Sequence, residues 1–132
     1  MEISDKVRSF LMEKRFAVLA TVGNDGLPHQ SVMWYALEGD EILMNTLRGR
    51  VKDENIQRDP RVSICIEDEY SWVTLVGEAR LIEEQAQAQA DIRGLAIRYH
   101  GEEDGNKQAD KLFAKQERIT IRIKINRVVD HV

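Results

Sequence analysis

Tight turns between short β-prone runs constrain this chain more than any other feature of its sequence. Asp25-Gly26, a strong hairpin signal, follows the apolar run of residues 16–22. Turn-like residues 38–40 and 68–70 each separate two further β-prone runs. Strands joined by such short turns pair antiparallel, because a parallel connection needs about a dozen residues or more. The sequence therefore predicts a mainly β protein built from antiparallel hairpins.

Six strands and three or four flanking helices are expected. The clearest strand is residues 118–125, where four isoleucines alternate with polar residues, so that one face is buried. Gly77, inside a long strand, indicates a bulge or a close backbone approach. The expected strands are residues 16–22, 27–37, 41–45, 61–67, 71–82 and 118–125; the expected helices are residues 5–14, a segment ending near Arg58, 83–100 and 107–115, with 102–106 as a loop. The succession of hairpins favours an antiparallel barrel.

Length and charge exclude several classes of function. The 132 residues contain no linker or internal repeat, so a single domain of residues 1–132 is expected. A total of 19 Lys and Arg against 23 Asp and Glu gives a formal net charge of -4, which argues against a nucleic-acid partner. The single cysteine, Cys65, excludes an internal disulfide. Without a long apolar run, neither a membrane span nor a leader is expected, which predicts a cytoplasmic protein.

Residues 46–55 combine a hydroxyl, a glycine and cationic side chains at the expected start of a helix. Thr46, Arg48, Arg50 and Lys52 supply these groups. Helix N-termini carry unpaired backbone N–H groups and a partial positive charge, and Arg and Lys add charge-assisted hydrogen bonds to phosphate. A helix start ordinarily favours Asp and Glu, so cations there indicate a compensating anion. The segment predicts a bound phosphorylated cofactor; the alternative is a solvated basic helix start.

Side-chain chemistry for catalysis is sparse. His29, His100 and His131 lack the spacing of metal ligands, so surface or packing roles are expected and no metal site is predicted. No carboxylate pair stands out as a hydrolytic dyad, and the sequence has no glycine-rich nucleotide motif. An enzyme with a phosphate clamp but no evident acid, base or nucleophile borrows its chemistry from a cofactor. A flavin suits this pattern, and no catalytic residue is assigned.

The residues of several segments, in their order along the chain, match a known fold family. The segments are residues 17–22, Asp25-Gly26-Leu27-Pro28, Ser31-Val32-Met33-Trp34-Tyr35, residues 46–55, Arg58-Asp59-Pro60-Arg61-Val62-Ser63 and Gly77-Glu78-Ala79. They resemble the flavin-binding split barrels of the pyridoxamine 5'-phosphate oxidase-like superfamily, in particular the small branch of deazaflavin (coenzyme F(420))-dependent reductases. The resemblance covers about residues 8–128. It implies an antiparallel six-stranded split β-barrel that forms a homodimer with two cofactor sites at the subunit interface.

The resemblance also implies the cofactor-binding residues. They are Thr46, Arg48, Arg50 and Lys52 at the phosphate, and Ser31, Val32, Met33 and Trp34 along the flavin ring. Arg48 lies at a position where the family varies, and the alternative for Met33 and Trp34 is the barrel core. Trp72 is a candidate to complete the ring pocket from the other subunit, or else to pack at the dimer interface.

The implied function is that of a flavin-dependent oxidoreductase, which uses coenzyme F(420) (deazaflavin) or FMN to transfer a hydride to or from a small organic substrate. The spacing of Arg50, Lys52 and Asn55 resembles the deazaflavin branch more closely. The C-terminal motif of arginine and histidine by which true pyridoxamine phosphate oxidases hold their substrate is absent from the sequence, so oxidation of vitamin B6 is not expected. The alternatives are a non-catalytic flavin-binding carrier or redox sensor, and a structural dimer that binds only adventitious anions.

Overall fold

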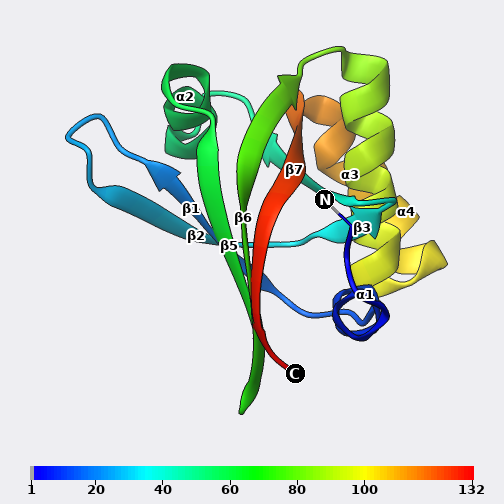
Figure 1. Ribbon diagram of the computed structural model, residues 1–132. Helices are drawn as coiled ribbons and strands as arrows, with labels where there is room; N and C mark the ends of the chain where they lie inside the picture. The colour runs from blue at the N-terminus through cyan, green and yellow to red at the C-terminus, as the bar shows by residue number, and fades with distance from the viewer. Residues whose placement is uncertain (1) are drawn as a thin grey trace.

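Seven antiparallel strands form one open sheet in the computed structural model, which describes residues 2–132 (Figure 1). The strands lie in the order β2-β1-β5-β6-β7-β4-β3. They are β1 (Ala17–Val22), β2 (Pro28–Met33), β3 (Ala36–Glu38), β4 (Glu41–Leu47), β5 (Arg61–Asp68), β6 (Ser71–Ile82) and β7 (Arg118–His131). The antiparallel hairpins predicted from the turn signals are confirmed.

Within residues 2–132, four α-helices and one short 3-10 helix flank the sheet. They are α1 (Asp5–Met12), α2 (Val51–Arg58), α3 (Gln85–His100), α4 (Glu102–Lys111) and η1 (Phe113–Lys115). The pair α3 and α4 packs beside β7 and β4, whereas α2 lies against β1 and β6 (Figure 1). Within residues 2–132, no helix is long and apolar enough to span a membrane.

The prediction of one strand over residues 27–37 is wrong, and this is why the sheet has seven strands instead of six. The chain leaves β2 after Met33 and enters β3 at Ala36, on the opposite edge of the sheet. Tyr35 is fully buried at the break, where its hydroxyl donates to the carbonyl of Leu11 at 2.9 Å and its backbone N–H donates to the Tyr99 hydroxyl at 3.1 Å. These bonds replace the strand pairing that Tyr35 would otherwise make.

Two further expectations differ from the structure at the C-terminal side. Residues 102–106 begin α4 instead of forming a loop, because the acidic residues Glu102, Glu103 and Asp104 complement the positive helix start. The final strand continues past residue 125 to His131, where it pairs with the first half of β6. The predicted irregularity at Gly77 is confirmed, since the register shifts there and an added Cβ would collide with the Lys124 carbonyl oxygen.

Candidate functional site

The start of α2 is fixed to the sheet by its own side chains. Gly49 turns the chain out of β4 with a φ of 89°, a conformation that favours glycine. Its backbone N–H donates to the Asp53 carboxylate at 3.1 Å, and Asp53 is buried. Asn55 donates to the Thr21 hydroxyl at 3.0 Å, and Arg58 donates to the Val22 carbonyl at 3.0 Å. The helix N-terminus is therefore held in one place relative to β1.

Arg50 and Lys52 stand at this N-terminus without an acidic partner. Arg50 is the N-cap residue, and its side chain does not cap the helix. Among residues 2–132, neither side chain makes an ion pair or a hydrogen bond. Burial, reinforced by the charge of Arg50, lowers the pKa of Lys52. An anion bound here would favour the charged form of Lys52 and would offset the repulsion between Lys52 and Arg50.

The expectation that cations replace acids at this helix start needs correction. The helix begins at Val51, and its first turn carries Asp53 and Glu54, the acids that a helix start favours. Arg48 lies before the helix and is already engaged, because it forms ion pairs with Glu83 at 2.5 Å and with Glu117 at 2.7 Å. Its predicted contact with a phosphate is not tested by this geometry and stays a prediction.

Arg118, which the sequence analysis did not select, joins the cationic group. It is only 8 % exposed, and its guanidinium contacts neutral groups: it donates to Asn45 at 3.0 Å and to Gln116 at 2.8 Å, and it lies 4.9 Å from the centre of the Phe113 ring. No carboxylate pairs with it among residues 2–132. Burial and the charge of Arg50 lower its pKa to about 10.

Strand pairing brings Arg118 to the turn before α2. The first residue of β7 pairs with Leu47 at the end of β4, and the Arg48 N–H donates to the Glu117 carbonyl at 2.9 Å. Thr46, one residue earlier, is buried on β4. Because side chains alternate along a strand, Thr46 faces the side of Met44, whereas Asn45 and its partner Arg118 face the other side. The spacing of residues in the sequence does not indicate that Arg118 lies beside the turn before α2.

The four residues predicted along the flavin ring do not share one face. Ser31 and Met33 point to the inner side of β2, where Met33 is part of the core, while Val32 points outward and is 69 % exposed. Trp34 follows the strand and stacks on Tyr99, with ring centres 5.2 Å apart. Since β2 is an edge strand, its outer backbone groups remain available for pairing. Contacts from all four residues to one ring would therefore need backbone atoms as well as side chains.

Trp72 lies at the other end of the sheet from α2. It stacks on His131, with ring centres 5.9 Å apart, close to the β5–β6 turn. The α2 end of β6 is marked by Gly77, because Val62 pairs both with Gly77 and with Thr21, the residue that anchors α2. Trp72 lies five residues before Gly77 along β6. This separation amounts to about 17 Å along the strand. Within one chain, Trp72 and the cationic group do not form a common site.

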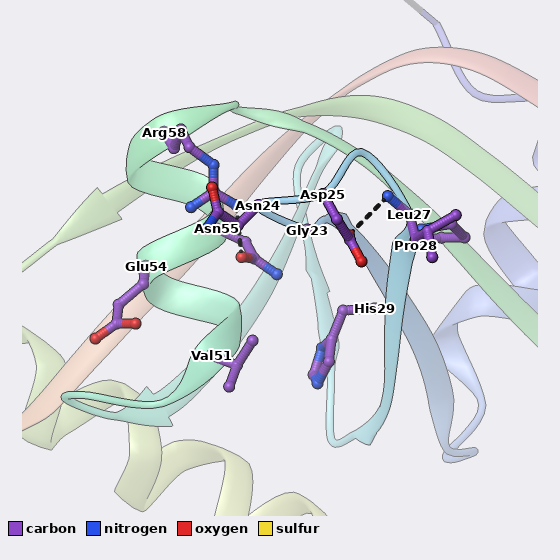
Figure 2. Close-up of a pocket in the computed structure, with 10 residues that line it drawn as sticks. All are labelled: Gly23, Asn24, Asp25, Leu27, Pro28, His29, Val51, Glu54, Asn55 and Arg58. Carbon is purple, nitrogen blue, oxygen red and sulfur yellow. Dashed lines mark hydrogen bonds between the residues drawn. The ribbon is translucent and has the colours of Figure 1, made fainter.

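A pocket of about 670 Å³ lies between the β1–β2 turn and α2 (Figure 2). Its lining residues are Gly23, Asn24, Asp25, Leu27, Pro28, His29, Val51, Glu54, Asn55 and Arg58. Val51 is 52 % exposed although it is apolar, and it begins the helix that carries Lys52. The pocket therefore adjoins the cationic helix start, and Val51 gives it an apolar wall on that side.

Comparison with known proteins places this chain in a family. Residues 3–131 match the family model of the pyridoxamine 5'-phosphate oxidase. The conserved hypothetical protein Rv2991 from Mycobacterium tuberculosis is 30% identical with a TM-score of 0.83, over 98% of this chain and 85% of that one. An F420 reductase is 22% identical with a TM-score of 0.78, over 96% of this chain and 98% of that one. General Stress Protein 26 from Bacillus anthracis is 20% identical with a TM-score of 0.71, over 96% of this chain and 91% of that one.

The latter two likenesses concern the fold, which they share along nearly the full length of this chain. The match to the family model covers almost every residue, including the β4–α2 turn and both ends of the sheet. It confirms the resemblance inferred from the segments around the hairpins and the basic helix start. This protein belongs to the pyridoxamine 5'-phosphate oxidase family.

Proposed function

We propose that this protein is a flavin-dependent oxidoreductase that binds coenzyme F(420) (deazaflavin) or FMN and transfers a hydride to or from a small organic substrate. The observation that carries the proposal is the group of three cations, Arg50, Lys52 and Arg118, that lack an acidic partner among residues 2–132. Arg118 is buried and Lys52 is half-buried, whereas Arg50 is exposed. Buried or half-buried charges without a partner are costly, and a phosphate would compensate those of Arg118 and Lys52. The flavin-binding character of the family supports the same reading.

The cofactor phosphate is assigned to the turn between β4 and α2. Arg50 and Lys52 bind it from the helix start, and Arg118 approaches from β7. The Thr46 hydroxyl lies on the opposite face of β4 from Arg118, so Thr46 reaches the same phosphate only through its backbone. Backbone N–H groups of the first helical turn lack a side-chain cap from Arg50 and are free to donate to the same oxygens. Arg48 is the least available cation of the segment because two carboxylates already hold it.

The flavin ring is assigned to the inner side and edge of β2. Ser31 and Met33 face inward, whereas Val32 and the edge of the strand are exposed, so the ring contacts backbone as well as side chains. A homodimer completes the site in this proposal, with Trp72 of the partner subunit closing the ring pocket. The separation of Trp72 from α2 within one chain supports a contribution across an interface.

The cofactor, when bound, supplies the hydride chemistry. The protein binds the phosphate through its cations, orients the ring against β2 and excludes water with the apolar wall at Val51. Between the two cofactors the deazaflavin is preferred, because the Arg50, Lys52 and Asn55 spacing resembles that branch. Oxidation of vitamin B6 is not proposed.

Titration with FMN and with the deazaflavin coenzyme tests the proposal directly. The double variant Arg50→Ala, Lys52→Ala removes two charge-assisted contacts and should weaken binding by about 3 kcal/mol or more. The matched control is Lys107→Ala, Lys111→Ala, which removes the same charge from exposed positions on α4. Unchanged affinity in the α2 variant, or an equal loss in the control, would contradict the assignment of the clamp.

A non-catalytic carrier or redox sensor is the rival function. It is supported by the few free acid-base groups at the pocket, where Asp25 accepts from the Leu27 N–H at 3.0 Å and Arg58 donates to Asn55 at 2.8 Å. Turnover separates the two functions. Cofactor binding without oxidation or reduction of quinones, enones or tetrapyrroles would favour the carrier, and a lack of binding at micromolar concentration would favour a structural dimer.

A further inference from the structure

Two buried polar atoms on β2 have no hydrogen-bond partner in the part of the chain that the structure describes. They are Nδ1 of His29 and Oγ of Ser31. Buried polar atoms in folded proteins are nearly always hydrogen-bonded, so each exception needs an explanation. An imidazole and a hydroxyl can each donate or accept one hydrogen bond. Together they form an unused polar pair.

Both side chains face the inner side of β2. Residues two apart on a strand share a face, and His29 and Ser31 lie opposite Thr21 and Leu19, which are buried on β1. Figure 2 shows His29 projecting from β2 into the space beside Val51, at the first turn of α2. His29 therefore lines the space that adjoins the cationic helix start, and Ser31 lies two residues further along the same face of β2.

Two other polar side chains around this space are already hydrogen-bonded. Asp25 holds the Leu27 N–H, and Asn55 is bonded to Thr21. Glu54 is exposed, and Figure 2 shows its carboxylate pointing away from His29. The space also has apolar lining residues, Val51, Leu27 and Pro28, beside the two groups that can donate or accept a hydrogen bond.

This combination fits one chemical class of ligand group. A flat heteroaromatic ring has apolar faces and an edge on which carbonyl oxygens alternate with an N–H, as in the pyrimidine portion of a flavin or a deazaflavin. A second phosphate fits this pair less well, because neither orphan group belongs to an Arg or Lys side chain. We propose that His29 and Ser31 hydrogen-bond the polar edge of the cofactor ring, so that His29, unassigned by the sequence analysis, is a cofactor-binding residue.

The inference rests on the proposed function, and it predicts a separate effect on cofactor affinity. The cationic group recognises only the phosphate, whereas the His29–Ser31 pair recognises only the ring. Loss of the pair should therefore weaken a cofactor and its phosphate-free form by the same factor. Loss of Arg50 and Lys52 should weaken only the phosphate-bearing form.

The first experiment measures the affinity of FMN, riboflavin, the deazaflavin coenzyme and its phosphate-free form. His29→Leu should weaken whichever cofactor binds, and its phosphate-free form, about tenfold each, because one hydrogen bond to the ring is lost. His29→Gln keeps a donor and an acceptor and should recover most of the affinity. A loss confined to the phosphate-bearing form, or no loss in His29→Leu, would overturn the proposal.

The second experiment observes the imidazole directly by NMR. The chain has only three histidines, so single variants assign every imidazole signal. On addition of the cofactor the His29 signals should shift most, while those of His100, which contacts Trp34 and not the ring itself in this proposal, should shift less. Cofactor binding that leaves the His29 signals in place would overturn this inference alone. Failure of both cofactors and both phosphate-free forms to bind would overturn the proposed function with it.

Discussion

The two ends of the β4–β7 strand pair carry arginines in opposite electrostatic surroundings. At the start of β4, Glu41 accepts hydrogen bonds from Arg80 at 2.7 Å and from Arg122 at 2.9 Å, and Arg122 also pairs with Glu38 at 2.9 Å. Hydrogen bonds from Arg80 and then Arg122 lower the pKa of Glu41 to about 2. Every cation of this cluster has an acidic partner within the chain.

At the other end of the same strand pair, Arg48 is the only cation of the group with acidic partners, Glu83 and Glu117, within residues 2–132. Arg118 contacts only neutral groups, and Arg50 and Lys52 make no ion pair within residues 2–132. Both ends lie on the same two strands, so strand stability alone does not explain the difference. A cluster in which each arginine pairs with a carboxylate stabilises the fold without a ligand. Cations without acidic partners are stabilised when an anionic ligand binds to them.

Of the single substitutions in the cationic group, Arg118→Met should produce the largest effect on binding and little effect on folding. Loss of the guanidinium should weaken a phosphate-bearing cofactor by about 2 kcal/mol, because a charge-assisted hydrogen bond disappears. The unfolding free energy of the cofactor-free protein should change by about 1 kcal/mol or less, since relief of a buried charge offsets the lost bonds to Asn45 and Gln116. Titration calorimetry and urea denaturation measure the two quantities.

Arg122→Met is the matched control on the same strand. It should destabilise the protein, because Glu38 and Glu41 lose their common partner, and it should leave cofactor affinity unchanged. If Arg118→Met destabilised the protein as much as Arg122→Met without affecting affinity, the two ends would not differ in the way described.

Replacing Glu41 with glutamine should destabilise the fold by about 1–2 kcal/mol at pH 7, because two arginines lose an anionic acceptor. The folded pKa of Glu41, about 2, lies below its ordinary value of 4.5, so its contribution is present above pH 4.5 and lost as the pH falls towards 2. Denaturation between pH 7 and pH 3 should show the difference from the wild type shrinking. The exposed control Asp130→Asn should show no such difference at pH 7.

The fold could be predicted where its causes are local. Alternating isoleucines gave the last strand, and the Asp25-Gly26 turn gave the first hairpin. The break at Tyr35 could not be predicted, since it depends on Tyr99, which lies 64 residues further along the chain. The polar extension of β7 to His131 was missed for a similar reason, because its pairing with β6 and not its composition makes it a strand.

In the candidate site, too, the residues that could be predicted are those that lie close together in the sequence. Arg50 and Lys52 belong to one helix start, so their gathering can be read from spacing. Arg118 and the partners of Arg48 reach the site through strand pairing over long sequence separations. His29 gave no signal in the sequence because its significance depends on a missing hydrogen-bond partner, which only the packed structure reveals.

The smallest expected effect concerns Lys52 in the cofactor-free protein. Burial and Arg50 place its folded pKa below the ordinary value of 10.5, so protonated Lys52 costs stability below that folded pKa, and the cost is relieved as the pH rises towards 10.5. Lys52→Met should therefore stabilise the cofactor-free protein by about 0.5 kcal/mol at pH 7. The gain in stability of Lys52→Met should shrink at higher pH, and inorganic phosphate should remove the gain by stabilising only the wild type.

The stability of the exposed control Lys111→Met, relative to the wild type, should depend on neither pH nor phosphate. A destabilised Lys52→Met protein, indifferent to phosphate, would mean that Lys52 serves the fold and that the two ends of the strand pair are alike.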